Sequence, residues 1–186
     1  MQYLTDQARV FRARAAAHAM PLDSVAHQPR AMFVSCSDAR LVPALLTAAR
    51  PGELFELRTY GGLIPPYDEK APTAESRTIE YAVNELNVSD IIVCGHSRCD
   101  VVTAAMLDNL AIAGVTGSDG EAAPPTGDVT AADHWHVLRQ LDALSDHPCV
   151  APRLADRSLH LHAWFHDIDT GATLAHHARA NTFLPL

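Results

Sequence analysis

Two short segments of the chain hold residues that together could bind a metal ion and carry out acid–base chemistry. The first is Cys-Ser-Asp-Ala-Arg at 36–40, and the second is Gly-His-Ser-Arg-Cys-Asp at 95–100. Zinc prefers cysteine sulfur and histidine nitrogen in a tetrahedral arrangement, and Cys36, His96 and Cys99 supply three such ligands. A site with three protein ligands keeps a fourth position for water or substrate, so this set indicates a catalytic zinc site rather than a structural one.

The elements that must position these residues alternate between strands and helices. Short apolar runs typical of buried strands cover 31–35, 54–59, 90–94 and 159–166, and helical patterns cover 78–86, 100–110 and 131–145. This order predicts an α/β fold with a central, mainly parallel β-sheet flanked by helices. Cys36 and His96 follow their strands closely, and ligands of parallel sheets gather beyond the carboxyl ends of the strands. Both residues are therefore expected at that edge.

The composition is that of a globular protein and limits the classes of partner. The 186 residues are 48% hydrophobic and 19% charged, which predicts a single domain over 1–186. The net charge of −8 and the absence of a basic run argue against nucleic-acid binding. No apolar stretch is long enough to span a bilayer and the N-terminus does not resemble a secretory signal, so we expect a cytoplasmic protein without a membrane partner. Four cysteines are too few for a disulfide scaffold, and Cys94 and Cys149 are interpreted as bystanders.

The two motifs resemble those of the β-class carbonic anhydrases, which carry Cys-Ser-Asp-Ser-Arg and His-Ser-x-Cys-Gly. The resemblance extends through 51–55, Arg58, 64–68, 79–83 and the tail 161–168, and it covers most of the chain from about Gln28 onward. It implies a β-carbonic anhydrase-like fold and a zinc enzyme that interconverts carbon dioxide and bicarbonate. It also implies a homodimer or homotetramer, with 1–28 as a helical N-terminal arm and pocket residues drawn from both subunits.

By this resemblance, Cys36, His96 and Cys99 would bind Zn²⁺, and zinc-bound hydroxide would attack the substrate carbon. Asp38 would accept a hydrogen bond from that hydroxide and aim it, while Arg40 would keep Asp38 ionised through a bidentate contact. In the family this aspartate can alternatively bind the zinc in a closed, inactive state. A plain ion pair that braces the loop is the structural alternative for Asp38 and Arg40.

The chain departs from the family where substrate would lie. The family's Arg-Asn-x-x-Asn becomes Arg58-Thr59-Tyr60-Gly61-Gly62, and the glycine after the last zinc ligand becomes Asp100. Tyr60 is expected to crowd the pocket or to pack in the core, and Asp100 to repel an anion or to cap a helix. Arg98 could neutralise Asp100 or contact an anionic substrate. The family's substrate-facing glutamine aligns with His27, with Gln28 adjacent. Phe55 and Tyr81 match the family's pocket residues.

These departures leave three functional hypotheses. The first is the reversible hydration of carbon dioxide. The second keeps the zinc and changes the electrophile, to carbonyl sulfide, carbon disulfide or a larger biosynthetic substrate. The third is a catalytically silent homologue that binds zinc as a partner or regulatory subunit.

Overall fold

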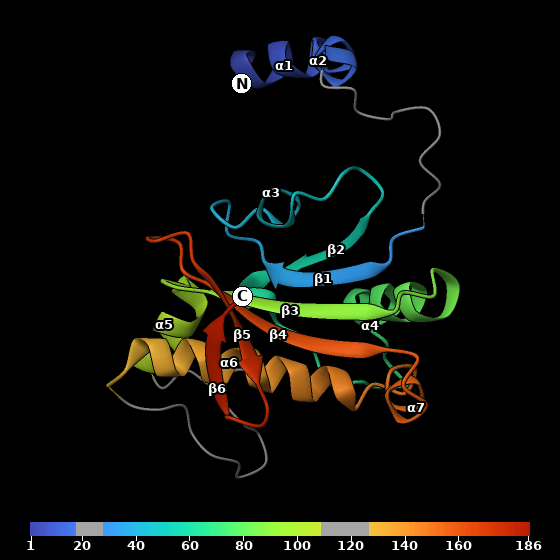
Figure 1. Cartoon of the computed structure of the whole chain (residues 1–186), viewed down its shortest axis with the longest axis vertical. Coiled ribbons are helices and arrows are strands. Elements are labelled where there is room, and N and C mark those ends of the chain that lie inside the picture. Colours follow the sequence, from blue (N-terminus) through green and yellow to red (C-terminus); the bar gives the residue numbers. More distant parts are fainter. Residues whose placement is uncertain (18–27, 109–126) are drawn as a thin grey trace.

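The computed structural model describes residues 1–17, 28–108 and 127–186, and its centre is a six-stranded sheet with the strand order β2-β1-β3-β4-β5-β6 (Figure 1). The first four strands in this order are parallel, and the last two are antiparallel to their neighbours. The strands are β1 (Ala31–Cys36), β2 (Leu54–Thr59), β3 (Asp90–His96), β4 (His160–His166), β5 (Thr173–His177) and β6 (Thr182–Pro185). The expected α/β fold with a mainly parallel sheet is confirmed.

The central strands are continuously apolar because both faces of the sheet are covered. On one face, Met32 and Val34 of β1 join Ile91 and Val93 of β3 in the largest core cluster, which also contains Val137. Val137 belongs to α6 (Val129–Ser145), the long helix that packs along β3 and β4. On the other face, a smaller cluster contains Phe33, Leu41, Ile92 and Cys94, with Leu46 of α3 (Pro43–Thr47) packed against it. The sheet is thus a rigid platform for whatever lies at its ends.

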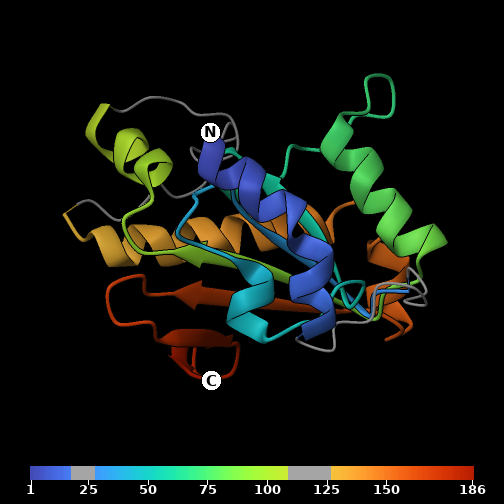
Figure 2. The same cartoon turned by 90° about the horizontal axis from the view of Figure 1, so that it is seen from above.

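The remaining helices lie mainly at the two ends of the sheet. Figures 1 and 2 both show α5 at the carboxyl end of the parallel strands and α4 at the opposite end. The elements are η1 (Tyr60–Gly62), α4 (Ala74–Glu80), η2 (Tyr81–Glu85), α5 (Asp100–Asp108) and α7 (Ala151–Ala155). Local sequence sets the helix starts: the Thr73 hydroxyl accepts from the Ser76 amide at α4, and the Asp128 carboxylate accepts from the Ala131 amide at α6.

The main differences from the sequence expectation concern the ends of β1 and β3, the last two strands and the helix expected over 78–86. Cys36 and His96 are the last residues of β1 and β3 rather than the residues that follow them, because both still make ladder pairs. The sequence predicted no strands after residue 166, whereas β5 and β6 form a hairpin on the edge of β4. The helix expected over 78–86 begins earlier, at Ala74, and its second half has π-helical hydrogen bonding.

The N-terminal residues form two short helices, α1 (Gln2–Arg9) and α2 (Phe11–Ala17), which Figure 1 shows apart from the sheet. Residues 2–9 and 11–17 of the expected N-terminal arm over 1–28 are helical, while 18–27 lie outside the described residues. Several large apolar side chains of this pair are exposed: Met1, Tyr3, Leu4, Val10 and Phe11. Among the described helices, none has the length and apolar character needed to cross a membrane.

Candidate metal centre and active site

Three potential metal ligands converge at the carboxyl end of the sheet. Cys36 ends β1, His96 ends the neighbouring strand β3, and Cys99 follows after a two-residue turn. Their ligand atoms all lie within 4.8 Å of one another, and all three residues are buried. Within the described residues this is the one such group of His, Cys, Asp and Glu side chains. The parallel topology thus brings together ligands separated by about 60 positions in the chain.

The hydrogen bonding of His96 leaves one ring nitrogen ready for a metal ion. Its Nδ1 lies 2.9 Å from the Ser97 carbonyl oxygen, so Nδ1 must carry the proton and donate it. The other nitrogen, Nε2, is buried and has no hydrogen-bond partner. A histidine that donates one N–H to a backbone carbonyl while its second nitrogen is free has the usual arrangement of a metal ligand. The unpartnered Nε2 of His96 and the sulfurs of Cys36 and Cys99 are the kinds of ligand that zinc prefers.

The two sulfurs also have the electrostatics of a metal-binding pair. Hydrogen bonding from Cys99 lowers the pKa of Cys36 to about 4 against the effect of burial, and the amides of Asp38 and Gly61 add to this. The pairing with Cys36 and burial raise the pKa of Cys99, so in the absence of metal the two sulfurs share one proton. A dication would displace that proton, because metal-bound cysteines are thiolates.

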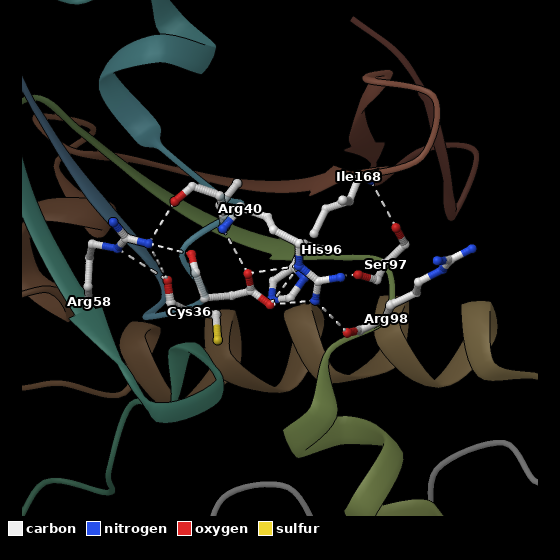
Figure 3. Close-up of polar contacts among 9 residues, drawn as sticks. Cys36, Arg40, Arg58, His96, Ser97, Arg98 and Ile168 are labelled. Carbon is white, nitrogen blue, oxygen red and sulfur yellow. Dashed lines mark hydrogen bonds and ion pairs between the residues drawn. The ribbon is translucent and has the colours of Figure 1, made fainter. Parts of the chain in front are cut away.

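Beside the ligands, Asp38 and Arg40 form a bidentate ion pair. Arg40 Nη2 lies 2.6 Å from Asp38 Oδ2 and Arg40 Nε lies 3.0 Å from Asp38 Oδ1. These hydrogen bonds from Arg40 hold the pKa of Asp38 well below its usual range. Arg40 Nη2 also contacts the carbonyl oxygen of Arg98 at 3.3 Å, which ties this pair to the turn between His96 and Cys99 (Figure 3).

Arg58 fixes the loop that carries Cys36, Asp38 and Arg40. Its guanidinium donates to three backbone carbonyls, those of Cys36, Asp38 and Leu41, at distances from 2.6 to 3.3 Å (Figure 3). Because Arg58 is on β2, directly beside β1, a rigid strand holds this loop. The Arg58 side chain therefore has a structural task rather than a place in a substrate pocket.

The Tyr60-Gly61-Gly62 turn lies against the ligands and needs both glycines. Each has a φ of 70°, a left-handed conformation that L side chains rarely adopt. A Cβ on Gly61 would lie 2.7 Å from Val101 Cγ1, and one on Gly62 would lie 3.3 Å from the Cys36 amide nitrogen. Tyr60 itself is 66% exposed, so the interpretation of Tyr60 as a core aromatic is wrong.

Phe55 and Tyr81 do not join the metal ligands within one chain. Their rings contact each other with centroids 5.8 Å apart. Phe55 pairs with Met32 near the start of β1, whereas Cys36 ends that strand, four residues or about 13 Å further along. Gln28 is exposed and precedes the same end of β1 as Phe55, and His27 lies outside the described residues.

Arg98 and Asp100 do not pair with each other. Arg98 Nη2 lies 2.8 Å from Asp169 Oδ2, and Asp100 is the exposed first residue of α5. The position before the helix belongs to Cys99, whose sulfur accepts hydrogen bonds from the amides of Val101 and Val102. The expectation that Asp100 is the N-cap is therefore wrong.

Two buried polar residues near the site, Asp133 and His136, carried no sequence motif. Both face inward from α6 with 3% of their surface exposed. Burial raises the pKa of Asp133 to about 7, against the attraction of His96, and lowers the pKa of His136. Sequence reasoning could have found them by their spacing of three and four residues with Gln140. This spacing places three polar residues on the core-facing side of an amphipathic helix, where apolar residues are expected.

Comparisons with known proteins agree with this fold and site. The carbonic anhydrase family profile matches residues 31–173. A carbonic anhydrase of Pseudomonas aeruginosa is 40% identical over 172 residues, which cover 85% of this chain and 78% of that protein. Carbonic anhydrase 1 of Escherichia coli O157:H7 is 37% identical with the same coverage. The solved structure of the β-carbonic anhydrase CcaA superposes with a TM-score of 0.85 at 29% identity, covering 100% of this chain and 92% of that chain.

A mainly parallel sheet with a Cys-His-Cys cluster at its carboxyl end defines an α/β metalloenzyme of the zinc type. The chain belongs to the β-carbonic anhydrase family, whose members are zinc lyases.

Proposed function

We propose that this protein catalyses the reversible hydration of carbon dioxide to bicarbonate at a zinc ion held by Cys36, His96 and Cys99. The observation that carries the proposal is the buried, partnerless Nε2 of His96 facing two sulfurs beside an intact Asp38–Arg40 pair. A bound zinc ion lowers the pKa of its water from about 15.7 to near 7, which supplies a nucleophile at neutral pH. The remaining tasks fall to side chains of this chain.

Asp38 and Arg40 would orient the reacting groups. Because Arg40 keeps Asp38 ionised, the carboxylate can accept a hydrogen bond from the attacking water or hydroxide and aim its lone pair. Arg40 has its Nη2 between Asp38 and the Arg98 carbonyl, so the guanidinium cannot swing away without losing both contacts. The pair therefore favours one orientation of the nucleophile.

The substrate pocket would be completed by a second copy of the chain. Phe55 and Tyr81 lie at the opposite end of the sheet from Cys36, and Tyr60 and Tyr81 are 66% and 45% exposed. The exposed apolar side chains of α1 and α2 also need a partner surface. We infer a homodimer, or a homotetramer built from dimers. Light scattering of the full chain and of a variant lacking 1–17 tests this: the full chain should be oligomeric and the variant smaller, and a monomeric full chain would contradict it.

The test of the activity is stopped-flow hydration of carbon dioxide between pH 7 and 9, with zinc counted in the same preparation. We expect one zinc per chain and a rate that rises with pH. A Cys99→Ser variant, which removes one sulfur ligand, should lose zinc and rate together. Full zinc occupancy without hydration would reject the proposed reaction.

Tyr60 supports a second candidate, a different electrophile such as carbonyl sulfide, carbon disulfide or a larger substrate. Its ring is exposed on the turn that lies against the ligands. If so, zinc-loaded protein should turn over a heteroallene faster than carbon dioxide, and Tyr60→Val with Asp100→Gly should shift the preference toward carbon dioxide. Turnover of any small electrophile would remove the third hypothesis, a silent homologue.

None of the four cysteines forms a disulfide, which suits a reducing compartment. We therefore propose that the protein acts in the cytoplasm.

A further inference from the structure

Helix α6 carries three buried polar side chains on the face that it turns toward the site. Asp133, His136 and Gln140 are spaced by three and four residues and are 3%, 3% and 1% exposed. Polar side chains are seldom placed on the buried face of a helix unless they have partners there. Two of them, His136 and Gln140, reach across to the chain around the Tyr60-Gly61-Gly62 turn.

Gln140 and His136 form a chain of hydrogen bonds from the Ile64 amide to the Gly61 carbonyl, in which each residue accepts one bond and donates the next. The amide of Ile64 donates to Gln140 Oε1 at 2.8 Å, so the other end of the Gln140 side chain is the NH2 group. That NH2 group lies 3.5 Å from His136 Nδ1, which is therefore the acceptor. The proton of the neutral imidazole is then on Nε2, which donates to the Gly61 carbonyl oxygen at 2.8 Å.

Gly61 connects this chain of hydrogen bonds to the metal ligands. Its backbone amide hydrogen-bonds the sulfur of Cys36, and its carbonyl is the group that His136 holds. Gly61 has no side chain with which to anchor itself, and glycine adopts positive and negative φ about equally readily, so contacts of its peptide groups select the observed φ of 70°. The orientation of the peptide groups around Gly61 thus depends on the contact with His136.

We propose that His136 is a positioning residue of the metal centre, which fixes the Gly61 turn so that its amide points at the Cys36 sulfur. The inference rests on the zinc site of the proposed function. It adds the contact between His136 and Gly61, which orients the hydrogen bond to the ligand Cys36. An N–H···S hydrogen bond stabilises the sulfur lone pairs and orients the ligand. Removal of outer groups that orient metal ligands typically weakens metal binding by about 10- to 100-fold.

The experiment compares His136→Leu with His136→Gln in the full chain. Leucine fills similar space without a donor, whereas the glutamine Nε2 can reach the Gly61 carbonyl as the imidazole Nε2 does. The readouts are the zinc dissociation constant by chelator competition and the sulfur-to-metal charge-transfer band of the cobalt-substituted protein. We expect His136→Leu to weaken zinc binding about 10- to 100-fold and to move the band to longer wavelength. His136→Gln should restore both values.

A control on the same helix separates positioning from general loss of stability. Leu144 is fully buried on α6 and belongs to the large core cluster, so Leu144→Ala should destabilise the fold while leaving the band in place. An unshifted band and unchanged zinc affinity in His136→Leu, or the same band shift in Leu144→Ala, would overturn the proposal.

If His136→Leu does not fold, Gln140→Leu replaces it: a smaller band shift in the same direction supports the proposal and no shift overturns it. Wild-type protein that binds zinc but does not hydrate carbon dioxide would reject the proposed reaction alone.

Discussion

Arg40 and Asp38, two residues apart in the sequence, face each other through two nitrogens and two oxygens, with Nη2 2.6 Å from Oδ2 and Nε 3.0 Å from Oδ1. The Asp38 side chain is only 15% exposed, so the contact is shielded from solvent on the aspartate side. The Arg40 amide donates to the same carboxylate at 2.8 Å. A carboxylate held by three donors has a fixed direction, which is what orientation of a nucleophile requires.

Asp38→Asn tests this relationship without changing the shape of the residue. We expect zinc content to stay the same, because Asp38 is not among the converging ligand atoms. The hydration rate should fall about 100-fold or more, since removing a positioned proton-accepting group typically has an effect of this size. Stopped-flow assays with metal analysis measure both. A variant with near-normal rates would show that the pair only braces the loop.

Removal of the metal should make Cys36 the most reactive thiol. Without zinc its pKa is lowered to about 4 by hydrogen bonding from Cys99, so it is a thiolate at neutral pH. Burial raises the pKa of Cys94 to about 12, which makes Cys94 the internal control. Mass spectrometry after iodoacetamide treatment should find Cys36 labelled in chelator-treated protein and protected in zinc-loaded protein. Equal labelling in both samples would argue against Cys36 as a ligand.

Because Arg98 lies in the turn between His96 and Cys99, its replacement by alanine and by glycine should change the stability of the protein to different extents. Arg98 has a φ of 57°, and its ion pair with Asp169 is exposed, at 68% and 49% of the two side chains. Arg98→Ala loses the ion pair and keeps the strained backbone, whereas Arg98→Gly loses the pair but relieves the strain. We expect the glycine variant to be more stable than the alanine variant by about 1 kcal/mol. Denaturant unfolding of the zinc-loaded proteins measures the difference, and equal stabilities would contradict the prediction.

Ionisation of the buried Asp133 should make the stability of the protein depend on pH. Burial raises its pKa from 3.8 to about 7, so the folded state keeps a proton that the unfolded state releases. The wild type therefore loses stability from this group as pH rises from about 4 to 7, and the loss is complete above that range. Asp133→Asn cannot ionise, so its stability relative to wild type should grow over the same interval, by at most about 4 kcal/mol.

Denaturant unfolding of both proteins at pH 5, 6, 7 and 8 measures this difference. Asp146, an exposed carboxylate at the end of the same helix, supplies the control variant Asp146→Asn. A stability difference that is flat with pH, or equal in the two variants, would exclude an ionising buried carboxyl at position 133.

The sequence by itself predicted the parallel strands and the candidate metal ligands. Buried parallel strands are apolar on both faces, so β1 and β3 were recognisable as short continuous runs. Cys36 and His96 end such runs, and parallel strands bring their carboxyl ends to one edge. The Asp38–Arg40 pair was equally accessible, because both partners belong to one short loop.

Only the tertiary structure decided which distant residues meet. The partner of Arg98 is Asp169, 71 positions away, rather than its neighbour Asp100, because the left-handed turn directs Arg98 toward the loop after β4. His136 reaches the Gly61 carbonyl across a separation of 75 residues, and no local pattern encodes such a contact. Phe55 and Tyr81 lie at the far end of the sheet from Cys36, because strand register sets the distance along β1 and β2. Periodicity and motifs describe neighbours along the chain, whereas these relationships follow from packing between strands and helices that are remote in the sequence.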